Sequence, residues 1–341
     1  MGRVPVRTGV TPYSVATLAA RSSDYLFSNP QQWVLSNVLY ISAATTTRKY
    51  GRVPPGHMEG QASAPAAGTI LNALATGTGS AFAIDEYVTA RVDLTADEGV
   101  TGTVAGADDA DTRLIERCVE LVTARFGNGE GGTVRTESQI PMAAGLKSSS
   151  AAANATVMAT LSALDAVDEL SPEEATRLGV EAARDVGVTV TGAFDDASAS
   201  MLGGVTVTDN QTDELLHRET RDWDVLVWSP PEKAYSAEAD VDRCRQLAPV
   251  ADLVADLALG GEFERAMTVN GFAYCAALGF SAEPMLDALP AVAGVSLSGT
   301  GPSFTAVGER ASLEYIRERW GERPGTTLLT TTQSEGVHID D

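Results

Sequence analysis

Alternation of apolar and polar residues is clearest between positions 81 and 95, in the segment AFAIDEYVTARVDLT. A period of two predicts a strand with one buried face. A second strand is predicted over 61–71 (QASAPAAGTIL), followed by a tight turn, and Gly77 and Gly79 make the loop that leads into 81–95 compact. The pattern therefore predicts two strands joined by a short loop.

Helices are predicted where a starting signal precedes small or apolar residues. The segment 171–174, Ser-Pro-Glu-Glu, places serine at the N-cap, proline at N1 and glutamate at N3, which predicts a helix ending near Asp185. The other expected strands are 100–104, 133–136, 224–228, two strands flanking a glycine-rich turn within 294–307, and 326–331. The other expected helices are 110–125, the helix after 141–150 that ends near 164, 238–247, 249–258, 261–278 and 310–320, with Phe272, Tyr274 and Cys275 in the core.

Charge separates the first 57 residues from the rest. Residues 1–57 hold six basic residues and one acid, whereas the remainder holds 18 basic and 45 acidic residues. An Arg- and Ser-rich, acid-poor start is typical of an organellar transit peptide. The alternative is that Met58 is the true start, which the abrupt change at a methionine favours. Under either interpretation we expect residues 1–57 to be a leader outside the fold.

Composition limits the partners. With 341 residues, 44% of them hydrophobic, the chain can bury the core of one large domain or two closely joined ones. A net charge of −22 argues against nucleic acid and anionic membrane surfaces as partners. Only three of the 24 basic residues are lysines, as is typical of proteins from a high-salt cytoplasm. An acidic protein encoded by GC-rich DNA is compatible with the same composition.

The cysteines and the hydropathy predict a cytoplasmic protein. The three cysteines are far apart and form no CxxC pair, so they indicate neither a disulfide framework nor a zinc site. No apolar run approaches the roughly 18 residues that a membrane span needs.

The segment 141–154, PMAAGLKSSSAAAN, predicts an anion site at a helix start. A helix start has unpaired N–H groups and the positive end of the dipole, Gly145 permits close approach, and Lys147 adds a cation. Serine hydroxyls can donate to phosphate or ligate Mg²⁺. The alternative is a plain N-cap without ligand, although a cap needs only one hydroxyl. The expected phosphate-binding residues are Pro141, Ala144, Gly145, Leu146, Lys147, Ser148, Ser149, Ser150 and Ala151, and the candidate anion is a nucleoside triphosphate.

A pair of carboxylates, Asp195 and Asp196, is predicted to follow an apolar strand and a glycine within 189–200. Buried acids repel one another and need partners. Phosphoryl transfer to an alcohol can use one carboxylate to orient the hydroxyl and accept its proton, and another to hold metal. The alternative is an Asx-capped turn.

Together with the Gly-x-Gly-Pro-Ser turn at 299–303, which predicts a hairpin, these segments resemble the GHMP kinases in order and spacing over residues 58–332. The central segment is similar to their motif Pro-x-x-x-Gly-Leu-x-Ser-Ser-(Ser)-Ala. In the first motif Ala64-Pro65 is present, but Ala66 and Ala67 stand where lysine would lie. This lysine-less first motif with Asn-Ala-x-Ala-Thr-Gly after it, Gly-Leu-Lys-Ser-Ser-Ser, and Thr-Gly-Ala-Phe-Asp-Asp resemble the archaeal-type shikimate kinases.

The resemblance implies an α+β fold. It places an ATP-binding domain similar to the ribosomal S5 domain 2-like fold at 58–215 and a ferredoxin-like domain at 216–341, with the active site between them. The implied reaction moves the γ-phosphoryl of ATP to the 3-hydroxyl of shikimate, a step of aromatic amino-acid synthesis through chorismate.

The resemblance also assigns roles to residues. Asp196, seven residues before Gly203-Gly204, is the expected base and Asp195 the second choice, although without the first-motif lysine the need for a base stays open. The expected Mg²⁺ ligands are Ser149, Ser150 and Glu181, and the expected substrate-binding residues are Asp85, Gly299, Thr300 and Gly301. Several other acids share the helix of Glu181, Asp85 reads equally as an acid on an exposed strand face, and Lys233 reads as an exposed loop lysine.

Two other functions stay open. A GHMP kinase for homoserine or mevalonate would share the phosphate-binding segment but differ at Asp85 and the Asp-Asp pair. A non-catalytic ligand sensor on the same fold would usually lose phosphate-binding or acidic residues, all of which are present here. The three histidines are scattered, which argues against histidine catalysis.

Overall fold

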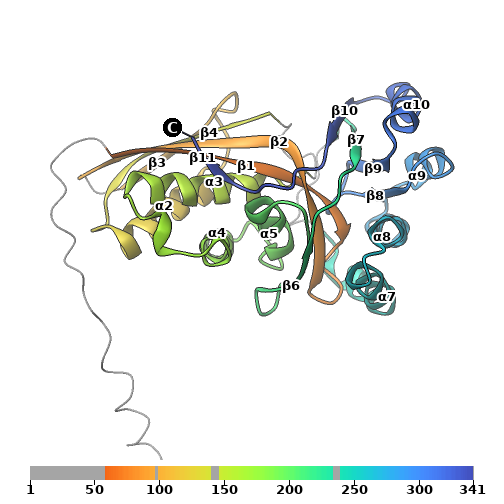
Figure 1. Cartoon of the computed structure of the whole chain (residues 1–341), viewed down its shortest axis with the longest axis horizontal. Helices are drawn as coiled ribbons and strands as arrows, with labels where there is room; N and C mark the ends of the chain where they lie inside the picture. The colour runs from red at the N-terminus through yellow and green to blue at the C-terminus, as the bar shows by residue number, and fades with distance from the viewer. Residues whose placement is uncertain (1–57, 97–98, 140–145, 233–238, 341) are drawn as a thin grey trace, which may run out of the picture. The chain divides into compact units, whose positions relative to one another are not determined.

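A computed structural model of the chain describes residues 58–96, 99–139, 146–232 and 239–340. The expectations for the leader 1–57, for Pro141, Ala144 and Gly145, and for Lys233 lie outside the described residues. The described residues all belong to one compact unit, Pro54–Asp341. That unit contains two β-sheets (Figure 1).

The first sheet has seven strands, in the order β11-β1-β2-β4-β3, with β5 paired to β2 and β6 paired to β5. All of these pairs are antiparallel except β3–β4. The strands are β1 (Met58–Leu71), β2 (Thr78–Thr95), β3 (Val100–Val104), β4 (Gly131–Ser138), β5 (Val205–Asp209), β6 (Glu214–Glu219) and β11 (His338–Ile339). The long strand β2 organises this sheet, because it pairs with β1 along its length, with β5 near its start and with β4 near its end.

Four helices gather beside the first sheet: α2 (Arg113–Phe126), α3 (Ser148–Ala163), α4 (Pro172–Asp185) and α5 (Phe194–Leu202) (Figure 1). Helix α3 packs directly on β1 and β2. Its small side chains allow a close approach, and a Cβ at Gly60 of β1 would lie only 2.0 Å from the carbonyl oxygen of Ala159. The alanine-rich composition of this helix thus allows its C-terminal half to lie close to β1.

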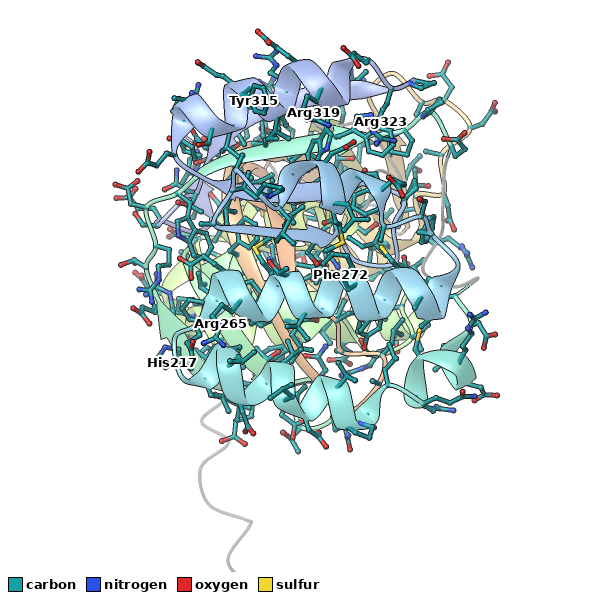
Figure 2. The ribbon with its side chains drawn as sticks, turned by 90° about the vertical axis from the view of Figure 1, so that its right-hand side faces the viewer. His217, Arg265, Phe272, Tyr315, Arg319 and Arg323 are labelled. Atoms are coloured by element: carbon teal, nitrogen blue, oxygen red, sulfur yellow. The ribbon has the colours of Figure 1, made fainter. Side chains whose placement is uncertain are left out.

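The second sheet has four antiparallel strands in the order β10-β7-β9-β8. They are β7 (Asp224–Ser229), β8 (Gly294–Leu297), β9 (Phe304–Gly308) and β10 (Thr326–Thr331). The helices in this part of the chain are α6 (Val241–Arg245), α7 (Ala248–Leu259), α8 (Phe263–Leu278), α9 (Glu283–Ala288) and α10 (Arg310–Gly321), of which α7 packs on α8 and on β1 and β2 of the first sheet. Figure 2 shows Arg319 in the last turn of α10 and Arg323 just after this helix, and both form ion pairs with Asp287 of α9. Trp320, between them in sequence, is fully buried.

Most predicted elements are confirmed. The capping box of α4 forms as expected, with Glu174 N–H donating to Ser171 Oγ and Ser171 N–H donating to the Glu174 carboxylate. Tyr274 and Cys275 are buried, whereas Phe272 is only half-buried and lies on α8 (Figure 2). The strand expected before the two aspartates is wrong: residues 189–193 form loop and bend, and both carboxylates lie in the first turn of α5. No helix in the described ranges is long and apolar enough to cross a membrane.

Candidate active site

The described part of the phosphate-binding segment begins at Leu146, which is docked on β1. Ala67 N–H donates to the carbonyl of Leu146 at 3.3 Å, and the Leu146 side chain is buried in the main core. Ala66 and Ala67 are themselves fully buried. The first motif, which contains Ala64-Pro65, and the second motif, the phosphate-binding segment 141–154, therefore meet at this point of β1.

Helix α3 begins without a side-chain cap. Its N-cap is Lys147, with φ of 62° in the left-handed region, and no acidic residue lies in its first turn. Ser148, Ser149 and Ser150 lie inside the first turn rather than at the N-cap position, so the plain serine cap considered from the sequence is wrong. The first N–H groups of a helix have no partner within the helix, and its dipole favours an anion there. This helix start has the chemistry of an anion site.

Ala151 differs from its neighbours in the motif. Its N–H donates to the carbonyl of Lys147 at 3.1 Å, and its side chain is fully buried in the core. Its place in the motif is thus explained by packing, because any larger side chain would push the helix start away from the core.

The acid pair lies at the start of α5. Asp195 and Asp196 are 4% and 7% exposed, so both carboxylates are removed from bulk water. The residue before the helix, Ala193, has a φ of 52°, an uncommon conformation for a residue with a Cβ. Successive helical positions face different directions, and the two carboxylates consequently meet different neighbours.

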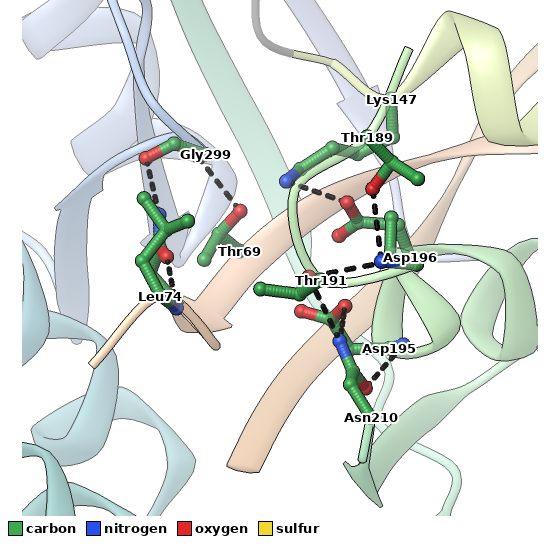
Figure 3. A network of polar contacts seen from close by, with 12 residues as sticks. Thr69, Leu74, Lys147, Thr189, Thr191, Asp195, Asp196, Asn210 and Gly299 are labelled. Atoms are coloured by element: carbon green, nitrogen blue, oxygen red, sulfur yellow. Dashed lines mark hydrogen bonds and ion pairs between the residues drawn. The ribbon is translucent and has the colours of Figure 1, made fainter. Parts of the chain in front are cut away.

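Asp196 faces the start of α3. Lys147 Nζ lies 2.8 Å from Asp196 Oδ2, and the two side chains are 14% and 9% exposed (Figure 3). Asp196 Oδ1 is buried and has no hydrogen-bond partner among the described residues. The second motif and the acid pair are therefore joined by a buried ion pair that leaves one carboxylate oxygen unsatisfied.

Asp195 is held on the opposite side, by Asn210 after β5. Asn210 Nδ2 donates to Asp195 Oδ1 at 2.7 Å, and Asp195 N–H donates to Asn210 Oδ1 at 3.1 Å (Figure 3). A Cβ at Gly79 of β2 would lie 2.5 Å from Asp195 Oδ2, so this glycine is needed for the carboxylate to fit. Asp195 is a tightly held structural neighbour of Asp196.

Burial and charge set the protonation of the pair. Burial and the neighbouring Asp195 raise the pKa of Asp196 to about 7, against the lowering effect of Lys147. Burial alone would lower the pKa of Lys147, but the carboxylates of Asp196 and Asp195 raise it above its ordinary value. The ammonium thus stays charged, and Asp196 is an acid that can gain and lose a proton near neutral pH.

The third motif, the Gly-x-Gly-Pro-Ser turn at 299–303, is tied to the end of β1 by hydrogen bonds. Gly299 N–H donates to Thr69 Oγ1 at 2.8 Å, and Asn72 Nδ2 donates to the carbonyl of Gly299 at 2.9 Å (Figure 3). Asn72 N–H donates in turn to Asn270 Oδ1, and the Tyr274 hydroxyl donates to the carbonyl of Asn72. The last residues of β1 and those just after it therefore contact both the second and the third motif, through Ala67 and through Thr69 and Asn72.

Comparison with known proteins identifies the family of this chain. The family described as "GHMP kinases N terminal domain" matches residues 113–204. A shikimate kinase from Halobacterium salinarum is 60% identical over 82% of this chain and 99% of its own length. A shikimate kinase from Methanosarcina mazei is 54% identical over 82% of this chain and 96% of its own length. The chain belongs to the archaeal shikimate kinase family of the GHMP kinases.

Solved structures support the same fold for this shikimate kinase family member. A homoserine kinase from Cytophaga hutchinsonii matches with a TM-score of 0.66 at 16% identity, covering 85% of this chain and 99% of that one. The Methanococcus jannaschii mevalonate kinase matches with a TM-score of 0.63 at 14% identity, covering 82% and 99%. The mixed α+β GHMP kinase fold expected from the sequence is confirmed.

The residues expected to hold metal are not brought together by any described contact. Ser149 is exposed at the start of α3, Ser150 is half-buried, and Glu181 is exposed on α4. Among the described residues, no group of three or more His, Cys, Asp or Glu side chains could hold a metal ion. Mg²⁺ commonly takes only one or two protein ligands and completes its shell with waters and phosphate oxygens, so the serine hydroxyls fit such an ion. The metal assignment of Ser149, Ser150 and Glu181 stays a prediction.

The expected substrate-binding residues also differ in their surroundings. Asp85 is exposed on β2, where Gln333 Nε2 donates to its Oδ1 at 3.3 Å, and no described contact joins it to Lys147 or Asp196. Gly301 is buried with a φ of 82°, and a Cβ there would lie 2.6 Å from the ring of Phe280. Thr300 is half-buried in the same turn. The roles of Asp85, Gly299, Thr300 and Gly301 stay predictions.

Sequence reasoning missed three polar residues that shape the site. Asn210 holds Asp195, and Thr69 and Asn72 hold the third motif. Asn72 and Thr69 do lie in the segments that resemble the archaeal-type shikimate kinases, so the motif marked them without giving their role. For Asn210 the sequence carries no comparable signal.

Proposed function

We propose that this chain is a shikimate kinase that transfers the γ-phosphoryl group of ATP to the 3-hydroxyl of shikimate. The observation that carries the proposal is the buried Lys147–Asp196 pair at the uncapped start of α3, in a chain 60% identical to a shikimate kinase over nearly all of that protein. The pair places an acid that titrates near neutral pH beside an anion site. Phosphoryl transfer to an alcohol can use such an arrangement.

ATP would bind with its phosphates at the start of α3. The first-turn N–H groups and the hydroxyls of Ser148, Ser149 and Ser150 supply donors, and the helix dipole favours the negative charge. In a chain of net charge −22, such a local anion site is needed to offset the repulsion of the whole molecule.

Asp196 would orient the attacking hydroxyl. Its unpartnered Oδ1 can accept the hydrogen bond of the 3-hydroxyl, and the proton passes to this carboxylate as the hydroxyl oxygen bonds to the γ-phosphorus. The bond between that phosphorus and the bridging oxygen of ADP breaks in the same transfer. Most of the acceleration in such reactions comes from positioning and electrostatic stabilisation of the phosphoryl group.

Mg²⁺ bound with ATP would neutralise charge on the phosphates. Ser149 or Ser150, with Glu181, are the residues proposed to hold it. Their hydroxyl and carboxylate oxygens are ligands that Mg²⁺ prefers.

The test is ATP turnover by the purified protein in high KCl with Mg²⁺, using shikimate, homoserine and mevalonate in parallel. We expect turnover with shikimate alone and a product phosphorylated at the 3-position, identified by nuclear magnetic resonance. Turnover only with homoserine or mevalonate would keep the kinase and discard the substrate. ATP binding without turnover on any of the three would favour a ligand sensor.

A further inference from the structure

We propose that Lys147 is a positioning residue for the catalytic carboxylate: its ammonium holds Asp196 Oδ2 and leaves Oδ1 to receive the hydroxyl of the substrate. The inference rests on the proposed kinase function and deepens it, because it gives the two oxygens of one carboxylate different partners. It also gives Lys147 the main role of holding the Asp196 carboxylate, whereas the sequence predicted that Lys147 binds phosphate.

The first observation is the geometry of the pair. The Nζ–Oδ2 distance is 2.8 Å, and neither side chain exposes more than 14% of its surface. Exposed ion pairs hold their members loosely, whereas removing one member of a buried pair leaves an uncompensated charge. The left-handed backbone conformation of Lys147 is uncommon for a residue with a Cβ, and it occurs at the residue whose ammonium contacts Asp196.

The second observation is the oxygen that remains. Asp196 Oδ1 is buried without a hydrogen-bond partner among the described residues, while Oδ1 of the adjacent Asp195 receives a bond from Asn210. A buried acceptor left without a donor is unfavourable, and such groups are rare in folded proteins. A ligand hydroxyl at the start of α3 would supply the missing donor.

The third observation is the set of charges around Asp196. Among the described residues, the charged groups that act on it are Asp195 on the same helix and Lys147 before α3. Asn210 and Gly79, which approach from the β5–β6 loop and from β2, lie against Asp195 and carry no charge. Lys147 is thus the influence that lowers the pKa of Asp196, and without it burial and Asp195 both act to keep the carboxyl protonated.

The test compares Lys147→Met and Lys147→Arg with the wild-type protein in steady-state kinetics over pH. We expect Lys147→Met to lower kcat by about 10- to 100-fold at neutral pH, as part of what a positioned base contributes, with the KM for ATP nearly unchanged. The acidic limb of the kcat profile should move to higher pH, and part of the lost rate should return there. Lys147→Arg retains the charge, so its acidic limb should stay near that of the wild type.

The matched control is Arg113→Met, which removes the same charge from an exposed ion pair with Asp111. It should leave kcat, KM and the pH profile as in the wild type. A Lys147→Met enzyme with a KM for ATP raised more than tenfold, and with kcat and the acidic limb unchanged, would overturn the proposal and make Lys147 a phosphate ligand.

A second measurement uses no substrate and so separates this proposal from the proposed function. Denaturant unfolding of Lys147→Met, Asp196→Asn and the double variant forms a double-mutant cycle. We expect each single variant to be destabilised, because each leaves one buried partner, and the double variant to lose less than the sum of the two. Strict additivity would overturn the pair even if shikimate turnover were found. A clear coupling would support it even if another alcohol proved to be the substrate.

Discussion

At the scale of single residues, the two neighbouring aspartates make different contacts. Asp196 faces Lys147 and has one oxygen without a hydrogen-bond partner in the described part of the chain, whereas Asp195 is bonded twice to Asn210 and fills the space left by Gly79. The two groups are chemically identical, so the difference lies in which elements surround each position of the first turn of α5. This difference supports the proposal that Asp196 is the reacting acid, with Asp195 as its support.

This division predicts unequal effects of the two amide substitutions. Asp196→Asn should lower kcat by about 10²- to 10⁴-fold, the range typical of a lost general base. Asp195→Asn should cost far less, because an amide oxygen can still accept the hydrogen bond from Asn210. Both should be measured by initial rates at saturating ATP and shikimate, with circular dichroism to show that each variant is folded. A larger loss for Asp195→Asn would move the base to Asp195.

The sequence predicted which residues lie at this site, but it did not predict the contacts between them. Lys147 and Asp196 were both expected from motifs, since each motif is a run of neighbouring residues. Their ion pair joins positions 49 apart at the starts of two different helices, and no local pattern in the sequence predicts such a contact. The partnership of Asn210 with Asp195 depends on where β5 ends and is invisible to sequence patterns for the same reason.

At the scale of elements, β1 is the strand that aligns the motifs. Ala67 bonds to Leu146 before α3, and Thr69 with Asn72 holds Gly299 in the turn between β8 and β9. The register of β1 against β2 shifts between Pro65 and Ala67 and again between Thr69 and Leu71, so the strand is irregular where these contacts are made. A shift of β1 would displace both motifs together.

Replacement of Asn72 tests this role. Asn72→Ala removes the donor to Gly299 and the acceptor of Leu74 N–H, and should lower the free energy of unfolding by about 1–3 kcal/mol. Because the turn at Gly299 would lose one anchor, we expect the KM for shikimate to rise more than the KM for ATP. The measurements are denaturant unfolding and steady-state kinetics. The control is Asn128→Ala in an exposed turn, and equal effects of the two substitutions would contradict an anchoring role for Asn72.

Elements with a strong local signature were predicted well. The capping box of α4, the alternation of β2 and the glycine-rich turn between β8 and β9 all appear where expected. The short helix α5 was missed because four of its nine residues are alanine or serine and because its first turn carries two acids, which are typical of a loop. The β5–β6 hairpin was missed as well, since both strands are short and only β5 is stabilised by pairing with the distant strand β2.

At the scale of the whole molecule, charge is the dominant feature. The net charge of −22 is carried by a chain whose ion pairs, among the described residues, are mostly exposed, such as Arg113–Asp111 and Arg245–Asp242. Exposed pairs contribute little, whereas the repulsion among excess carboxylates acts against the compact state. The fold should consequently depend on ions that screen this repulsion.

We therefore expect the temperature of unfolding to rise as KCl is raised from 0.1 M to 1 M, over which the screening length falls from about 10 Å to about 3 Å. Thermal unfolding followed by circular dichroism measures this. Sucrose of matched osmolality serves as the control, because it favours compact states without screening charge. A rise with sucrose as large as that with KCl would show that repulsion among the carboxylates is not the cause.

The pairing of β11 with β1 has a consequence for biosynthesis. Residues 338–339 complete an edge of the first sheet beside Ala62 and Ser63, and Asp340 accepts hydrogen bonds from Gln61 and Ser63. A ribosome delivers the chain from its N-terminus, so β1 leaves the exit tunnel long before its last neighbour has been translated. Through most of translation this edge of β1 is an open strand without its β11 partner, the kind of surface at which nascent chains associate. The strand β11, which closes this edge of the sheet, is thus translated long after β1.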